Sequence, residues 1–222
     1  RDDHDAVAGL IDEEDGYVHL TVQVNEGEQY RLGRIEIRGN RRTKDKVVRR
    51  ELRFYPEELY DSEEAKRAEQ RLVETRLFSE ATITPQGETP GVRDALVEVA
   101  EADSTTILFG VGVTSNSGVV GSISIEQRNF DLFDTPRSMG EFFKGRSFRG
   151  AGQTLRLTLE PGTELNRGRI EFREPYLMDR DIGLGLGAYV FERQREEYDE
   201  SRIGFYTSFD KRWHEGLLKD WA

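Results

Sequence analysis

From residue 103 onward the sequence alternates between apolar and other residues as extended strands do, and helical periodicity is absent. The first segment, Thr105–Thr114, places apolar residues on one face and glycines on the other. The apolar residues are Ile107, Phe109, Val111 and Val113, and the glycines are Gly110 and Gly112. Six segments of this kind are predicted: 105–114, 119–130, 153–160, 169–174, 182–192 and 202–212. This part of the chain is therefore expected to fold as a sheet of consecutive strands.

The lengths of these segments fit strands that cross a membrane. Several are close to the ~9–11 residues that span a bilayer as a tilted strand. Segment 182–192 repeats the arrangement of the first, with Gly183, Gly185 and Gly187 opposite its apolar residues. We expect the glycine face to be smooth and the other face to contact lipid.

The composition by itself suggests an acidic soluble protein, with a mean hydropathy of -0.70, 34% charged residues and a net charge of -11. A barrel of strands is compatible with these values because only alternate residues face lipid. No run approaches the ~18 apolar residues of a transmembrane helix. The acidic balance argues against nucleic acid as a partner, since a phosphate backbone is held by a basic surface. The chain has no cysteine, which excludes a disulfide scaffold and a thiolate metal site.

Residues 28–102 have the pattern of a complete small domain with the element order β-α-α-β-β. A short helix carries Val47, Val48 and Leu52 on its apolar edge. A longer helix follows Asp61, with Glu64 three residues further on, which is a capping-box-like start. Two strands, 81–84 and 95–100, complete the unit. The predicted core face contains Ile35, Ile37, Leu72, Ile83, Leu96 and either Val97 or Val99.

Residues 1–27 contain two extended patterns, 6–11 and 17–24, joined by an acidic turn that ends in Gly16. A lone hairpin is only marginally stable in water. We therefore expect these residues to be the C-terminal hairpin of a preceding domain. The chain thus opens in the middle of a pattern, which predicts that it is part of a longer protein.

Two segments of the unit resemble the POTRA domain, the periplasmic module of the BamA/Omp85 outer-membrane protein family. They are Ile35-Glu-Ile-Arg-Gly-Asn40, followed by Thr43–Leu52, and Leu72-Val-Glu-Thr-Arg-Leu-Phe78. One departure is Arg76, which stands where the family often has glycine. If this position is left-handed, a residue with a side chain costs about 1 kcal/mol there.

The strand region resembles the start of the barrel of the same family. Gly110-Val-Gly112, Gly118, Gly121 and Gln127-Arg-Asn-Phe130 are similar to the first two barrel strands, and Arg169–Leu177 to the fourth strand and its Pro-Tyr turn. The resemblance implies an α+β POTRA domain at 28–102, followed at 103–222 by about six antiparallel transmembrane β-barrel strands, a partial barrel. The family fold has sixteen strands. Residues 131–149 form a longer connection than usual, to which the sequence assigns no role.

The resemblance implies an assembly factor that receives unfolded outer-membrane β-barrel clients and inserts them into the outer membrane. It implies no enzymatic activity and no cofactor, and it places the POTRA domain in the periplasm. Outer-membrane lipid is a further expected partner, and accessory assembly lipoproteins are compatible with the family. Client strands would add to the first barrel strand, which would also pair with the last. The expected gate strand consists of Thr105, Ile107, Leu108, Phe109, Gly110, Val111, Gly112 and Val113.

Other site patterns have simpler interpretations. His4, His19 and His214 lack metal-ligand spacing, so we expect no metal site. The run Gly183–Gly187 is not the dinucleotide fingerprint. The carboxylates at 196–200 are expected in a solvated loop. Arg41-Arg42 and Arg49-Arg50 are expected on a solvated face, with a partner or anionic lipid as the alternative contact.

Two other functions compete with assembly of barrel proteins. One is a secretion pore of the same superfamily, which would pass a partner through the barrel. The other is a soluble acidic α+β protein with a ligand-binding barrel, which would stay in solution without detergent. Only the second of these belongs to a different structural class, and it predicts a reading frame that ends near Ala222.

Overall fold

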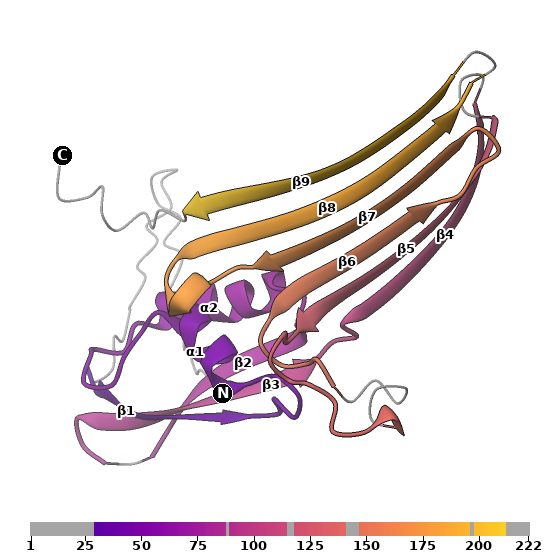
Figure 1. The fold of residues 1–222 in the computed structure, drawn as a ribbon. Helices are drawn as coiled ribbons and strands as arrows, with labels where there is room; N and C mark the ends of the chain where they lie inside the picture. Colours follow the sequence, from indigo (N-terminus) through magenta and orange to yellow (C-terminus); the bar gives the residue numbers. More distant parts are fainter. Residues whose placement is uncertain (1–28, 88, 115–117, 141–146, 196–197, 212–222) are drawn as a thin grey trace, which may run out of the picture.

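The computed structural model describes residues 29–87, 89–114, 118–140, 147–195 and 198–211. The predicted hairpin at 1–27, the three histidines and the pair Glu196-Glu197 lie outside the described residues. The described chain has two parts, an N-terminal unit (29–102) and a curved six-stranded sheet (Figure 1). Residues 102–104 alone join the last strand of the unit to the first strand of the sheet.

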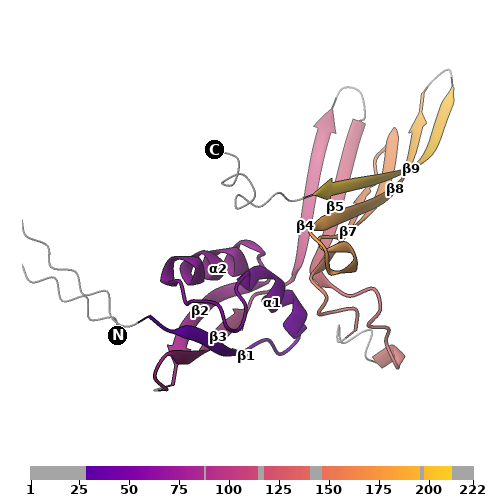
Figure 2. The ribbon, with the colours of Figure 1, turned by 90° about the vertical axis from the view of Figure 1, so that its left-hand side faces the viewer.

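The N-terminal unit has the predicted order β-α-α-β-β. Its elements are β1 (Arg31–Arg38), α1 (Asp45–Leu52), α2 (Ser62–Glu74), β2 (Phe78–Gln86) and β3 (Val92–Glu101). The strands lie in the order β1-β3-β2, with β1 parallel and β2 antiparallel to the central β3. Both helices lie on one face of this sheet (Figure 2).

The core of the unit lies between the helices and the sheet. The register of β3 turns both Val97 and Val99 toward the helices, together with Ala95. Leu96 was expected in this core, which is wrong, because neighbouring residues of a strand point to opposite faces. Leu96 is buried, but it is not a member of the core cluster. The helices contribute Val47, Val48, Leu52, Ala65, Ala68 and Leu72.

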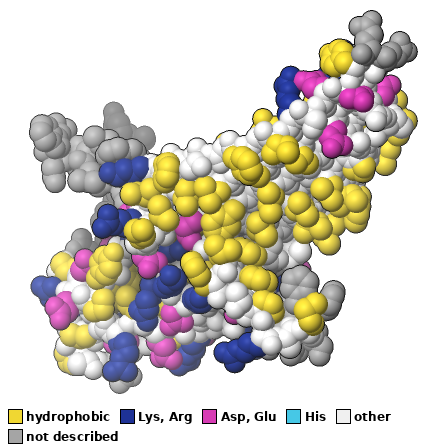
Figure 3. All heavy atoms as spheres, in the orientation of Figure 1, with side chains coloured by type: hydrophobic (Ala, Val, Ile, Leu, Met, Phe, Trp, Pro, Cys, Tyr) yellow, Lys and Arg dark blue, Asp and Glu magenta, His cyan; other side chains and the backbone are white. Residues whose placement is uncertain are grey.

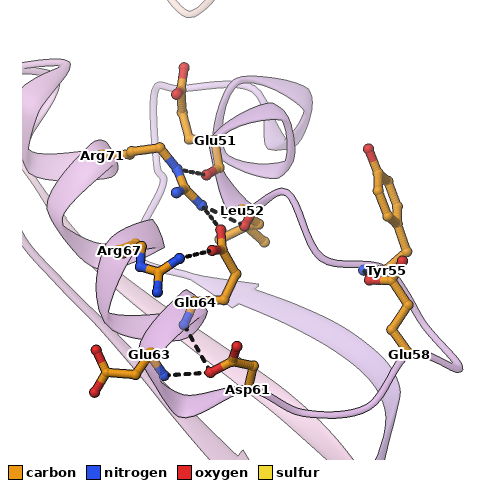
Figure 4. Close-up of polar contacts among 9 residues, drawn as sticks. All are labelled: Glu51, Leu52, Tyr55, Glu58, Asp61, Glu63, Glu64, Arg67 and Arg71. Atoms are coloured by element: carbon orange, nitrogen blue, oxygen red, sulfur yellow. Dashed lines mark hydrogen bonds and ion pairs between the residues drawn. The ribbon is translucent and has the colours of Figure 1, made fainter. Parts of the chain in front are cut away.

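The start of α2 is capped as the sequence predicts. The Asp61 carboxylate accepts hydrogen bonds from the Glu63 and Glu64 amides at 2.8 and 3.3 Å (Figure 4). The Glu64 side chain pairs instead with Arg67 and Arg71. Arg71 also donates at 2.9 Å to the carbonyls of Glu51 and Leu52. It therefore caps the C-terminus of α1 and ties the two helices together.

The turn after α2 contains the strained residue expected from the sequence. Arg76 has a φ of 58°, in the left-handed region, directly after the C-cap Thr75. A side chain in this conformation costs about 1 kcal/mol, whereas glycine adopts it freely.

We expect Arg76→Gly to stabilise the N-terminal unit by up to about 1 kcal/mol, because glycine removes the strain at the end of α2. Arg67→Gly is the matched control, since it places glycine within α2 and should destabilise the helix by about 1 kcal/mol. Amide hydrogen exchange of α2 measures both effects. Faster exchange in Arg76→Gly would contradict the assignment of strain.

The second part is a sheet in which every strand is antiparallel to its sequence neighbours. Its strands are β4 (Thr105–Thr114), β5 (Gly118–Phe130), β6 (Gln153–Glu160), β7 (Leu165–Glu174), β8 (Ile182–Gln194) and β9 (Asp199–Lys211). A short 3-10 helix, η1 (Leu177–Asp179), joins β7 to β8. β7 begins at Leu165, earlier than the predicted Arg169, because these residues pair with β8. No helix in the described part of the chain is long and apolar enough to cross a membrane.

Candidate functional site

The expected gate strand is one of the two edge strands of the six-stranded sheet, and β9 is the other. Within the described residues β4 pairs only with β5, in an unbroken register from Thr105 opposite Gln127 to Thr114 opposite Gly118. The hydroxyl of Thr105 contacts the Gln127 side chain. All eight expected residues lie on this strand, and from Ile107 to Val113 all are exposed.

One hydrogen bond shows which amides and carbonyls of β4 point toward the open edge. The Arg128 amide donates to the Ser104 carbonyl at 2.8 Å, so Ser104 and Arg128 form a hydrogen-bonded pair. Such pairs alternate with non-hydrogen-bonded pairs along an antiparallel ladder. The amides and carbonyls of residues 105, 107, 109, 111 and 113 therefore point toward the open edge. The even-numbered residues bond to β5.

The same odd-numbered residues carry the apolar side chains of β4. Phe109 is 77% exposed and Val111 is 84% exposed. The register places them beside Ile123 and Gly121 of β5. The open backbone edge and the apolar surface thus belong to the same residues.

An apolar belt continues across the whole sheet on this face. Cross-strand pairs match apolar residues with apolar residues or glycine: Ile125 with Leu157, Leu157 with Ile170, Ile170 with Ala188, Ala188 with Phe205, and Val190 with Ile203. Figure 3 shows hydrophobic side chains gathered over the strands, with charged side chains toward one end of the sheet and over the N-terminal unit. A belt of this kind is what a lipid-facing wall requires.

The opposite face of the sheet is polar. Glu126 on β5 pairs with Arg156 on β6, and Glu171 on β7 accepts a hydrogen bond from the Tyr206 hydroxyl on β9. Arg173 contacts Asp210 at 3.1 Å nearby. The first pair joins neighbouring strands, whereas the other two reach from β7 to β9 across the glycines of β8. Each pair satisfies its own charge and hydrogen bonds, as a wall facing a wet lumen would need.

The glycines of β8 do not leave a smooth face, contrary to the expectation from the sequence. A Cβ on Gly187 would overlap the Tyr206 ring, and one on Gly183 would overlap Asp210. Conversely, a Cβ on Gly204 of β9 would overlap the Tyr189 ring. Side chains of each strand thus lie across glycines of the other. The β4 glycines differ, because a Cβ on Gly112 would meet nothing within 4 Å.

We expect Gly187→Ala to destabilise the β8–β9 pairing, since its methyl group has to displace the Tyr206 ring. Gly112→Ala is the matched control, which should be neutral or stabilise the strand by about 0.5–1 kcal/mol, because alanine loses less entropy than glycine. Hydrogen exchange of the β4 and β9 amides measures both. Equal effects of the two substitutions would show that space around the glycines does not decide their role.

The N-terminal unit is attached to the sheet by a buried polar network. The Asn129 side chain on β5 donates to the Thr43 hydroxyl at 2.8 Å and accepts from the Gly152 amide at 3.0 Å. The Thr43 hydroxyl and amide in turn bond to the Glu101 carboxylate at 2.8 and 2.7 Å. Asn129 and Thr43 are both buried. The network therefore joins the two parts of the molecule.

The connection after β5, to which the sequence assigned no role, supplies a second attachment. Asp131, 1% exposed, forms an ion pair with Lys44 at 2.5 Å. The Lys44 amide donates to the Gly150 carbonyl at 2.9 Å. Gly150 has a φ of 115°, and a Cβ there would overlap the Arg42 carbonyl, so only glycine fits this approach. The two ends of the connection thus hold the unit just before α1.

One basic residue of α1, Arg50, is less solvated than the sequence suggests. The Arg50 guanidinium lies 4.1 Å from the ring centroid of the buried Tyr176, in the turn between β7 and β8. Arg49 donates to the Ile35 carbonyl at 3.2 Å. The solvated-face interpretation is therefore wrong for Arg50. A pocket of about 350 Å³ lies beside it, lined by residues of both parts.

The sequence pattern predicted β4 but not this junction. Its contacts join residues far apart in the chain, such as Thr43 and Asn129, and no periodic pattern relates them. The available signal was Asn129 and Asp131 flanking an aromatic residue at the end of a strand. Among the described residues there is no group of three or more His, Cys, Asp or Glu that could hold a metal ion.

We expect Asn129→Ala to loosen the N-terminal unit from the sheet, because it leaves the buried Gly152 amide without its acceptor and removes the donor to the Thr43 hydroxyl, which keeps only its bond to Glu101. The cost is about 1–3 kcal/mol for such buried groups. Asn166→Ala, which removes a hydrogen bond in an exposed turn, is the control. Faster limited proteolysis at 102–104 in Asn129→Ala alone supports the role. Equal cleavage in both variants would refute it.

Comparison with known proteins supports the resemblance seen in the sequence. Residues 30–102 match the POTRA family, described as a surface antigen variable number repeat. The chain is 25% identical over 195 residues to the outer membrane protein assembly factor BamA of Nitratidesulfovibrio vulgaris, covering 86% of this chain and 22% of that protein. It is 27% identical over 186 residues to BamA of Neisseria meningitidis serogroup B, covering 83% of this chain and 21% of that protein.

The fold is also that of a solved BamA. The crystal structure of BamA from Haemophilus ducreyi lacking POTRA domains 1-3 superposes with a TM-score of 0.71 at 22% identity, over 92% of this chain and 36% of that chain. The predicted fold class, a POTRA domain followed by antiparallel barrel-type strands, is thus confirmed, as is the resemblance to the BamA/Omp85 family. The chain spans about a fifth of the length of the curated relatives it matches.

Proposed function

Because this chain joins a POTRA domain to strands with the fold of BamA, we propose that it acts in assembling outer-membrane β-barrel proteins. Residues 103–222 form the first strands of a barrel in the outer membrane, and the POTRA domain lies in the periplasm. Unfolded barrel proteins are the clients, and they add as strands to β4. The proposal rests on one observation, the open edge of β4 within the apolar belt.

An unpaired strand edge is costly inside a membrane. In hydrocarbon, each unsatisfied backbone amide or carbonyl costs several kcal/mol. On β4 these outward groups belong to residues with exposed apolar side chains, such as Phe109 and Val111, so the edge lies at the lipid level of the belt. It therefore needs a partner strand, either the last strand of a closed barrel or an extended client. Strand addition supplies the missing hydrogen bonds without any bond chemistry.

The glycines of β4 support its role as a gate. A methyl group on Gly110 would have only the Ser122 Cβ within 4 Å, at 3.7 Å, and one on Gly112 would have no neighbour within that distance. Among the described residues, no side chain needs the space beside these glycines, in contrast to Gly187. Glycine weakens the interior of a strand and makes it easier to deform. A strand that must exchange one partner for another benefits from this compliance.

The attachment of the POTRA domain fits the same function. Asn129 and Asp131, at the end of β5, hold the domain at the base of the sheet beside the polar face. An unfolded client received in the periplasm would therefore reach β4 over a short path. Outer-membrane lipid contacts the apolar belt, and accessory lipoproteins would bind the POTRA side.

Photocrosslinking in the complete protein, reconstituted in lipid vesicles, tests the proposal. A photoreactive analogue of phenylalanine at Phe109 should crosslink to an unfolded barrel client during insertion. The same analogue at Ile170, in the middle of the apolar belt, should not, because its backbone is already paired on both sides. Crosslinks of equal yield at both positions would contradict strand addition at β4.

Proline substitutions distinguish loss of an outward amide on β4 from disruption of the β4–β5 hairpin. Val111→Pro removes an outward amide and should reduce client crosslinking while β4 and β5 stay paired. Gly110→Pro removes an amide that bonds to β5 and should disrupt the hairpin itself.

Crosslinks found mainly at Thr158, on the polar face, would indicate instead a secretion pore that passes its partner through the lumen.

A further inference from the structure

The outer edge of β2 in the POTRA domain is occupied by a side chain of the same domain. Glu69 on α2 accepts a hydrogen bond from the Ile83 amide at 2.6 Å. Because an amide has one hydrogen, Ile83 does not bond to β3, and its pair with Val97 is a non-hydrogen-bonded pair. The Ile83 amide therefore points away from the sheet, and the Glu69 carboxylate lies over the free edge.

The next outward position on this edge carries no donor. Hydrogen-bonded and non-hydrogen-bonded pairs alternate, so Ala81 and Pro85 also face outward. Proline has no amide hydrogen, and it is placed on edge strands for this reason. Between Ala81 and Pro85, β2 thus offers an incoming strand two amides, and Glu69 already occupies that of Ile83. Such features are how sheet edges avoid unwanted pairing.

The other edge of this sheet is also covered. The Leu32 amide donates to the Glu58 carbonyl, and the Leu32 carbonyl accepts from the Glu57 amide, both at 2.8 Å. Further along β1, the Ile35 carbonyl accepts from Arg49. The cover on β1 includes two backbone hydrogen bonds from a connecting segment, whereas the cover on Ile83 is one side chain. β2 is therefore the edge that opens at the lower cost.

We propose that Glu69 is a removable cap on β2, which keeps this edge closed until an extended polypeptide with a suitably placed basic side chain displaces it. This inference rests on the proposed function, in which unfolded clients are bound by strand addition. An incoming strand replaces the carboxylate with its own backbone carbonyl at the Ile83 amide. The displaced Glu69 then needs a new partner, and a Lys or Arg beside the Ile83 position supplies it.

The cap therefore gives the edge a selectivity that bare backbone pairing lacks. A strand with a basic residue at this position regains an ion pair when it enters. A strand with an acidic residue places two carboxylates together, which is unfavourable. The occupant of β2 is accordingly an extended segment with a basic residue near its centre.

Binding of synthetic peptides to the whole chain in detergent tests the cap. Three alternating Thr/Val peptides differ only at the central residue, which is Lys, Thr or Glu. The original chain should bind the Lys peptide most tightly and the Glu peptide least. In Glu69→Ala the Thr peptide should bind about tenfold more tightly, because no charged hydrogen bond has to be broken first, and the preference for Lys should disappear.

Two further variants sharpen the test. Glu69→Gln keeps an acceptor for the Ile83 amide but loses the charge, so the preference for Lys should disappear with a smaller gain for the Thr peptide. Gln70→Ala, the exposed neighbour on α2, should behave as the original chain. Hydrogen exchange of the Ala81 and Ile83 amides should slow when peptide binds.

Unchanged peptide affinity in Glu69→Ala would overturn the proposal, and so would protection of β1 instead of β2. These outcomes are distinct from failure of the proposed function. Crosslinks from Phe109 report on β4, whereas the Glu69 variants report on β2. If Phe109 gives no crosslinks but the peptides bind as expected, strand addition at β4 is refuted and the cap on β2 stands. If Phe109 crosslinks but Glu69→Ala leaves peptide binding unchanged, only the cap is refuted.

Discussion

Everything in this structure depends on how the edges of its two sheets satisfy their outward amides and carbonyls. β1 is covered by backbone from residues 57 and 58 and by Arg49. β2 carries Glu69 on one amide and proline at a neighbouring position. β4, one of the two edges of the larger sheet, has no such cover among the described residues, although its outward groups lie within the apolar belt. Unpaired groups are tolerable in water and costly in lipid, so the two sheets face different requirements.

The register of the larger sheet determines which side chains form its apolar face. Ile125, Leu157, Ile170 and Ala188 stand opposite each other on successive strands. A shift of one residue in any pairing would move an entire set of apolar side chains to the polar face, and a shift between β5 and β6 would also separate Glu126 from Arg156. The interlocked tyrosines and glycines of β8 and β9 resist such a shift, because each ring fits only over its own glycine.

Much of the fold could be predicted because a period of two is visible within a short segment. It located all six strands of the sheet. The left-handed conformation of Arg76 was suggested by the family resemblance, because Arg76 stands where the family often has glycine. The contents of the glycine face could not be predicted, since they depend on which strand lies beside β8. The junction of Thr43 with Asn129 and the contact of Glu69 with Ile83 were missed for the same reason. Single polar residues in such contacts leave no repeating pattern.

The link at 102–104 gives the two sheets a mechanical relation. β3, the central strand of the POTRA sheet, continues through these three residues into β4, an edge strand of the barrel wall. The link is itself tied at both ends, because the Ala102 amide bonds to the Leu77 carbonyl and the Ser104 carbonyl to the Arg128 amide. A movement of β4 along or across the sheet therefore transmits force directly to β3, the strand that pairs with both β1 and β2. A load on β4 thus reaches the middle of the POTRA sheet directly, whereas a load on β5 reaches the unit through Asn129 and Thr43.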